Sequence, residues 1–81
     1  MRYYFNTKNG TTHRDKTGTE LKDKAAARVQ AIRYAGTVMA DEPGVLWDGQ
    51  EFHVEVSDER GLQLFDVVCY VINAPAAGDT K

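Results

Sequence analysis

The segment EFHVE at positions 51–55 carries the densest group of side chains that could do chemistry. Glu51, His53 and Glu55 alternate with apolar residues, so all three point to one face of an extended strand. Imidazole and carboxylate groups bind divalent metals and exchange protons. Alternate side chains on one strand splay apart, however, and the run offers no fourth ligand. We therefore expect a solvated outer face that contacts a partner, with no metal ion and no cofactor.

Cys69 is the only cysteine, and it lies inside the most apolar stretch of the chain, FDVVCYVI at positions 65–72. A thiol in such a strand is usually inert packing, and neither His13 nor His53 is near it in sequence. A single cysteine excludes an intramolecular disulfide and a multi-cysteine zinc site. The sequence predicts no nucleophilic catalysis and no small-molecule substrate, and it favours a reducing, cytoplasmic location.

Phosphate and nucleic-acid chemistry have limited support. The stretch NGTTHRDKTG lacks the spacing of a phosphate loop, and no dinucleotide fingerprint follows a strand. Tyr3, Tyr4 and Phe5 could present stacking rings on a sheet. Four basic residues gather on and before the expected helix: Lys22, Lys24, Arg28 and Arg33. Because the isoelectric point is about 5.6, nucleic-acid binding through this basic flank stands as the alternative function.

The net charge of −2 conceals a polarised chain. Up to Ala40, eight basic and three acidic residues give +5, whereas from Asp41 onward two basic and nine acidic residues give −7. The two halves could neutralise each other in the fold. Alternatively, the acidic half could stay exposed and steer a basic partner.

Length and composition indicate one folded domain. A chain of 81 residues builds one modest core, and 42% hydrophobic with 27% charged residues is typical of folded soluble proteins. The apolar run is far shorter than the roughly 20 residues that span a bilayer, and Met1 to Asn6 lacks the apolar region of a signal peptide. We expect a domain over 1–73, a flexible tail over 74–81 and no membrane association.

Alternation around Asn9-Gly10 predicts a hairpin of strands at about 2–8 and 11–15 with a type I′ turn. Tyr3 and Phe5 would share one face of the first strand, and Tyr4 the other. A second hairpin is indicated by Phe52, Val54 and Val56, which alternate with polar residues, and by a turn over 58–61.

Past this second turn the alternation blurs, and a bulge near Phe65 and Asp66 would restore the register. The run to Ile72 then forms a final strand that is apolar on both sides. One side would pack under the helix. The other needs cover, so the strand is either central in the sheet or paired with a partner.

The helix between the hairpins is expected to begin after the capping residue Asp23 and to end at Pro43-Gly44. One apolar stripe has spacings of four, three, four and three, and we expect it to face the sheet: Ala25, Val29, Ile32, Gly36 and Met39. A second stripe would then face water: Ala27, Ala31, Tyr34 and Val38. It is either a run of good helix formers or a docking face anchored by Tyr34.

Three segments carry a resemblance to a family: MRYYFNTKNG, DKTGTELKDKAAARVQA and FHVEVSDERGLQLF. They are similar to short bacterial proteins with a domain of unknown function, which implies a ββαββ arrangement and supplies no activity. This chain departs from that pattern after Met39 and in the long apolar strand ending at Ile72. A fainter similarity is to antitoxin domains of HicB type, which implies binding to a partner protein.

We therefore expect an α+β domain in which a four-stranded antiparallel sheet carries one helix on one face. The expected function is a non-catalytic protein-binding module, acting as a stoichiometric inhibitor or regulator. It would resemble an antitoxin, or a phage-encoded inhibitor of a bacterial defence complex of the anti-CRISPR kind. The partner would be another protein, such as a basic nucleic-acid-binding complex, or a second copy of the chain. The expected contact residues are Tyr4, Tyr34, Val38, Glu51, His53, Glu55, Asp58 and Glu59.

Overall fold

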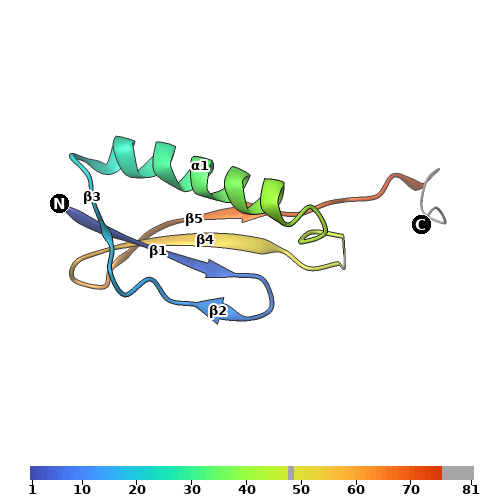
Figure 1. Ribbon diagram of the computed structural model, residues 1–81, viewed down its shortest axis with the longest axis horizontal. Coiled ribbons are helices and arrows are strands. Elements are labelled where there is room, and N and C mark those ends of the chain that lie inside the picture. Colours follow the sequence, from blue (N-terminus) through green and yellow to red (C-terminus); the bar gives the residue numbers. More distant parts are fainter. Residues whose placement is uncertain (48, 76–81) are drawn as a thin grey trace.

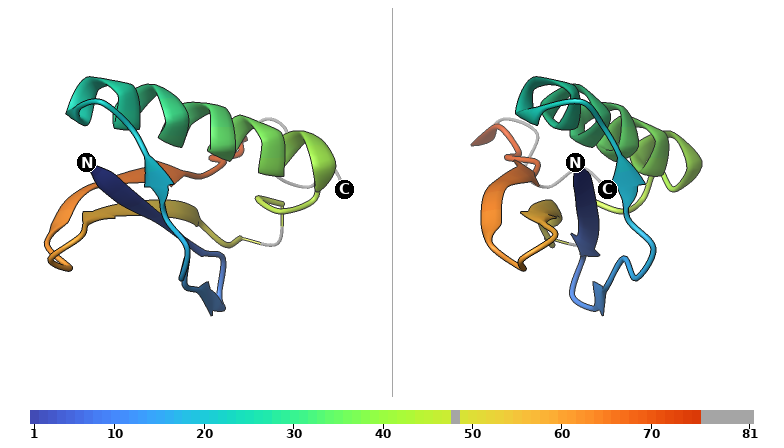
Figure 2. Two further views of the ribbon diagram at one scale, coloured as in Figure 1. Left: turned by 60° about the vertical axis from the view of Figure 1, so that its left-hand side comes forward. Right: turned by 90° about the vertical axis from the view of Figure 1, so that its left-hand side faces the viewer.

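The structure is a computed structural model that describes residues 1–47 and 49–75. In chain order the elements are β1 (Arg2–Lys8), β2 (Thr12–His13), β3 (Thr19–Glu20), α1 (Lys24–Asp41), β4 (Phe52–Asp58) and β5 (Gln63–Cys69). All strand pairs are antiparallel, in the order β2-β1-β4-β5, and β3 also pairs with β1. The single helix lies across one face of the sheet (Figures 1 and 2). The predicted α+β class, with one helix on an antiparallel sheet, is confirmed.

The expected strand over 11–15 is replaced by two short strands along the same edge of β1. Between them the Asp15 side chain takes the place of a strand: its Oδ2 accepts from the Phe5 N–H at 3.1 Å. In return, the Asp15 N–H donates to Oδ1 of Asn6 at 2.9 Å. Asp15 Oδ1 also accepts from the N–H groups of Thr17 and Gly18, both at 3.0 Å. One carboxylate thereby fastens the 15–18 connection to β1.

The loop of the first hairpin differs from the expected type I′ turn. Lys8 pairs with Thr12, which leaves three residues in the loop. Gly10 has φ +92°, but Asn9 does not have the positive φ that a type I′ turn requires, because among the described residues only glycines do. A three-residue loop needs one left-handed position, and Gly10 supplies it without a steric cost.

The core lies between α1 and the strands β1 and β4. Its fully buried members are Tyr3, Phe5, Phe52, Val54 and Val56 from the strands, and Ala27, Ala31 and Ala35 from the helix. The strands supply the bulk and the helix supplies only small side chains. This pairing lets the helix backbone approach the sheet closely while the interior stays filled.

The helix therefore buries the face that we expected to meet water. Ala27, Ala31 and Ala35 are buried, whereas Val29 and Ile32 are 51% and 60% exposed. The prediction that the larger apolar stripe faces the sheet was wrong. Periodicity identifies the faces of a helix, but the volume already supplied by the aromatic residues of β1 and β4 decides which face fits.

The ends of the helix follow local rules. The Asp23 side chain accepts from the Ala26 N–H at 2.9 Å, so the predicted N-cap is confirmed. The helix ends at Asp41, with Glu42 as its C-cap, two residues before Pro43. Within the part of the chain that the structure describes, no helix combines the length and apolar character needed to cross a membrane.

The β4–β5 hairpin contains the expected bulge. Val56 pairs with Phe65 and Ser57 with Gln63, so Leu64 is the extra residue, one position before the predicted place. β5 ends at Cys69, which pairs with Phe52 at the start of β4. The strand was expected to reach Ile72, but β4 provides no partner beyond Phe52, and the chain continues past the body of the sheet (Figure 1). Most of the predicted tail over 74–81 lies outside the described residues.

Candidate functional site on the outer face of the sheet

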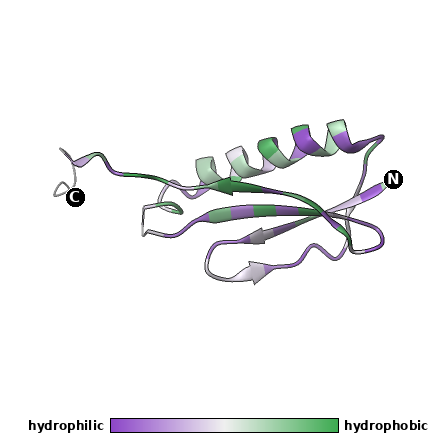
Figure 3. Ribbon diagram, turned by 180° about the vertical axis from the view of Figure 1, so that it is seen from behind, coloured by the Kyte–Doolittle hydropathy of each residue, from purple (hydrophilic) through white to green (hydrophobic). Residues whose placement is uncertain are grey.

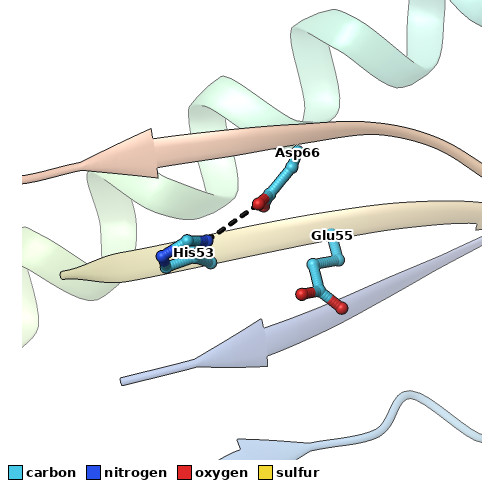
Figure 4. A group of neighbouring side chains, drawn as sticks. All are labelled: His53, Glu55 and Asp66. Carbon is cyan, nitrogen blue, oxygen red and sulfur yellow. Dashed lines mark hydrogen bonds and ion pairs between the residues drawn. The ribbon is translucent and has the colours of Figure 1, made fainter. Parts of the chain in front are cut away.

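The face of β4 and β5 turned away from α1 carries a histidine held between two carboxylates. Nδ1 of His53 lies 2.8 Å from Oδ2 of Asp66, and its Nε2 lies 2.9 Å from Oε1 of Glu51. Only 20% of the His53 side chain is exposed. Figure 4 shows the ring above β4, with Asp66 reaching toward it from β5. Both ring nitrogens are therefore engaged, which fixes the orientation of the imidazole.

The sheet register explains how these groups meet. Glu55 pairs directly with Asp66, and His53 pairs with Val68, so His53 and Asp66 are diagonal neighbours on one face. Like charges directly opposite each other destabilise a sheet. The His53 ring offsets this repulsion by donating toward Asp66 (Figure 4).

The environment favours the charged form of His53. The hydrogen bond to Asp66, followed by the one to Glu51, raises the pKa of His53 above its usual value. A protonated imidazole can donate from both nitrogens at once, as this geometry requires. The site thus holds a positive imidazole among carboxylates on the paired strands β4 and β5.

The cluster also contains metal-ligating atoms. His53, Glu55 and Asp66 each offer one ligand atom, and these atoms lie within 4.8 Å of one another. One imidazole nitrogen and two carboxylate oxygens could hold a divalent cation in place of the hydrogen bond between His53 and Asp66. The sequence did not predict Asp66 as a member of this site. Its contact with His53 joins two strands, and no residue pattern along β4 indicates which residue of β5 lies beside His53.

Two of the expected contact residues, Asp58 and Tyr4, are not freely exposed. Asp58 stabilises a turn, and Tyr4 is partly covered by its neighbours. Asp58 is buried on the helix-facing side, and its Oδ1 accepts from the N–H groups of Arg60 at 2.9 Å and Leu62 at 3.0 Å. The bond from Leu62, with that from Arg60, lowers the pKa of Asp58. Tyr4 lies on the outer face but is half-buried: a Cβ on Gly18 would lie 3.0 Å from its Cε2. We leave both residues out of the contact surface.

The remaining expected residues lie apart from the cluster. Glu59 is exposed in the turn between β4 and β5. Val38 is half-buried against the core, so it belongs to the interior side of α1. Tyr34 lines an open hollow of about 330 Å³ between α1 and the β1 edge, together with Gln30 and His13. The structure therefore brings together Glu51, His53 and Glu55, and does not bring Tyr34 or Val38 to them.

Charge is divided between the two layers of the molecule. The basic residues of the alternative function, Lys22, Lys24, Arg28 and Arg33, are all exposed on or just before α1. The carboxylates around His53 lie on the opposite face of the sheet. Because the two candidate surfaces lie on opposite faces, they can be altered separately, although Lys8 of β1 also lies on the outer face, opposite His53.

Cys69 and His53 point to opposite sides of the sheet. Cys69 pairs with the buried Phe52 and packs against the core. His53 is the next residue along β4, so its side chain projects to the outer face. The structure therefore does not pair this thiol with this imidazole.

Comparison with known proteins bears on the family and not on the activity. No curated protein and no solved structure matches the chain. A family model described as a domain of unknown function, DUF6894, matches residues 2–69, a span that runs from the first residue of β1 to the last of β5. The chain therefore belongs to the DUF6894 family.

Proposed function

We propose that this domain is a non-catalytic protein-binding module that acts as a stoichiometric inhibitor or regulator. It would present the outer face of β4 and β5 to a basic surface on another protein. The observation that carries this proposal is the ordered group of carboxylates, Glu51, Glu55 and Asp66, around His53 on the sheet face that the helix does not cover.

The physical basis is preorganisation. The His53 ring already holds the carboxylates of Asp66 and Glu51 before a partner arrives, and Glu55 projects from β4 directly opposite Asp66. On this face three carboxylates, Glu51, Glu55 and Asp66, outnumber the neighbouring cations His53 and Lys8. An excess of negative charge attracts a basic surface and mainly raises the rate of association. The complex would therefore weaken as salt rises.

A carboxylate face also suits an inhibitor. Carboxylates spaced along neighbouring strands can occupy a basic site that otherwise receives phosphate groups. The similarity to HicB-type antitoxin domains, which work by binding a partner protein, supports the same class of function. A nucleic-acid-binding protein is the partner that best fits this chemistry.

Charge reversal tests the proposal. Affinity capture from cells of the source organism is run with the native chain and with a Glu51→Lys, Glu55→Lys variant of the sheet face, and recovered proteins are quantified by mass spectrometry. The expected result is a specific protein partner that the variant no longer recovers. The matched control is Arg28→Glu with Arg33→Glu on α1, which should retain the partner. Circular dichroism checks that both variants fold.

Two results would overturn the proposal: no specific protein recovered by the native chain, or recovery unaffected by reversal of the sheet face. A purified partner then gives a second check. Its affinity for the native chain should fall as salt rises, and this salt dependence should be reduced in the sheet variant.

One observation favours the alternative, nucleic-acid binding. Lys22, Lys24, Arg28 and Arg33 are all exposed on one layer, away from the acidic face. Filter binding of single- and double-stranded probes against salt concentration tests it, because a phosphate binder weakens steeply as salt rises. This function requires binding that is lost in the Arg28→Glu, Arg33→Glu variant and kept in the sheet variant.

A further inference from the structure

We infer that the outer edge of β5 is a homodimer interface, at which β5 pairs antiparallel with β5 of a second copy of the chain. The two sheets would join into one continuous sheet with both helices on the same side. This edge adjoins the acidic cluster, because Asp66 lies on β5, but the inference is argued from the edge strand itself and does not depend on the proposed function.

The first observation is the position of β5 in the sheet. β5 is the last strand in the order β2-β1-β4-β5, and among residues 1–47 and 49–75 no strand pairs with its other edge. Such an edge offers backbone N–H and C=O groups to another strand. Proteins usually protect an edge with a lysine, a proline or a bulge. β5 has a bulge only at Leu64, and the run from Val67 to Ile72 contains neither a charge nor a proline.

The second observation is the segment that follows β5. Val68 is 42% exposed, Tyr70 58% and Ile72 79%, although all three are large apolar or aromatic residues. Tyr70 to Ile72 extend beyond the start of β4, so β4 cannot pair with them. Figure 3 shows this stretch as a nearly continuous hydrophobic band that leaves the body of the molecule.

A second copy gives this segment a partner. If Val68 faces Val68 of the second copy, Tyr70 faces Asp66, and Ile72 faces Leu64 of that copy. The segment from Tyr70 to Ile72 of one copy then lies along the start of β5 in the other copy, beside the bulge at Leu64. For Val68, Tyr70 and Asp66 this register keeps outer-face residues opposite outer-face residues, as a continuous pleated sheet requires, whereas the bulged residue Leu64 packs against the core.

The third observation is the apolar flank of α1 above β5. Successive helix residues are turned by about 100°, so Gln30 and Ile32 lie on opposite flanks of the buried Ala31. Gln30 lines the hollow at the β1 and β2 edge. Ile32 therefore lies on the β5 side, and Val29 is exposed on the same apolar stripe. The flank of α1 above β5 thus exposes the apolar Ile32, with the exposed Arg28 one turn before it.

The area fits a symmetric dimer. The exposed apolar residues on this surface are Ile32, Val68, Tyr70, Val71 and Ile72. From their exposed fractions they present on the order of 500 Å² per chain, so two copies would bury roughly 1,000 Å² before the strand backbones are counted. A specific interface needs about 1,000 Å² in total. The exposed apolar residues of this edge supply their own complement through two-fold symmetry, and the charged residues Asp66 and Arg28 border them.

Edge substitutions test the dimer. Sedimentation equilibrium and native mass spectrometry of the purified native chain should show a species of twice the 9.0 kDa chain mass. The Val68→Lys, Ile72→Lys variant should lose this species, because both side chains are exposed and their replacement spares the core. The matched control is Thr11→Lys with Thr12→Lys at the opposite edge, which should still dimerise. A native chain that stays monomeric across the micromolar range overturns the inference, as does a β5 variant that still dimerises.

A cross-link tests the register. In a Cys69→Ser background, Val68→Cys should form an intermolecular disulfide under mild oxidation, because directly opposite residues in an antiparallel pair have Cα atoms about 4.5–5.5 Å apart. Thr12→Cys in the same background should remain a monomer on a non-reducing gel. A dimer that forms without the Val68 cross-link overturns the proposed pairing. The Glu51→Lys, Glu55→Lys variant should still dimerise, which separates failure of this inference from failure of the proposed function.

Discussion

Single carboxylates hold the irregular parts of this fold together. Burial alone would raise the pKa of Asp15, but the N–H groups of Gly18, Phe5 and Thr17 outweigh it and lower the pKa. Asp58 holds the turn between β4 and β5 in a similar way. Both groups stabilise the fold when ionised, so this contribution is present above the ordinary carboxyl pKa and is lost as the pH falls through the lowered folded value.

Removing the Asp15 carboxylate should destabilise the domain without changing its fold. Asp15→Ala leaves the N–H groups of Phe5, Thr17 and Gly18 without this acceptor, and we expect a loss of about 1–3 kcal/mol in the free energy of unfolding. Urea denaturation at neutral pH measures it. Lys16→Ala, an exposed neighbour, is the control, and a loss no larger than in that control would contradict the assigned role.

His53 should make stability depend on pH in the opposite direction. Its pKa is raised in the folded chain, so its contribution is complete below the unfolded value of about 6.5 and disappears as the pH rises through the folded value. Urea denaturation between pH 5.5 and 8.5 should show this decline in the native chain. His53→Gln should flatten it, since His13 remains in both proteins. An NMR titration of His53 that gives an ordinary pKa would rule out the effect.

At the scale of elements, the helix and the sheet divide the core unequally. β4 contributes Phe52, Val54 and Val56, all fully buried, while α1 contributes alanines. The helix is held close to the sheet by small side chains, so the interface has little room for a larger one. Its exposed flank, by contrast, carries Val29 and Ile32.

This unequal core predicts which helix substitutions cost the most stability. The order is the reverse of the one that the hydrophobic periodicity of α1 predicts. Ala31→Leu should destabilise the domain by about 1–3 kcal/mol through overpacking. Ile32→Ala should cost less than about 1 kcal/mol, whereas a buried isoleucine would cost about 2–5 kcal/mol. Thermal and urea unfolding are measured in the Val68→Lys, Ile72→Lys background, so that association does not contribute. A larger loss for Ile32→Ala than for Ala31→Leu would show that the helix packs on its other face.

At the scale of the whole molecule, the polarity along the chain becomes in part a polarity across its thickness, although Lys8 of β1 lies on the acidic side, opposite His53. The basic residues before and on α1 lie on one layer, and the carboxylates around His53 lie on the other side of the sheet. β4 lies between β1 and β5 and beneath the helix, which makes it the most enclosed element (Figure 2). β2 and β3 are two-residue strands at the margin.

Hydrogen exchange should follow this arrangement. The amides of β4 should exchange slowest, at a rate set by unfolding of the whole domain, and those of β2 and β3 should exchange through local opening. Exchange measured by NMR gives the rate for each amide. Equal protection of β2 and β4 would mean that the margin and the centre unfold together.

The sequence by itself determined the features that depend on neighbouring residues. The Asp23 cap, the end of the helix before Pro43, the alternation of Phe52, Val54 and Val56, and the need for a bulge all follow from local geometry.

Tertiary structure decided which side of α1 is buried, because that choice depends on the volume supplied by residues distant in sequence. It also decided that Asp66 meets His53, since strand register places them together, and that Asp15 takes the place of a strand beside Phe5. In the same way β5 became an edge strand rather than a central one, because the order of strands in a sheet is set by packing of the whole chain.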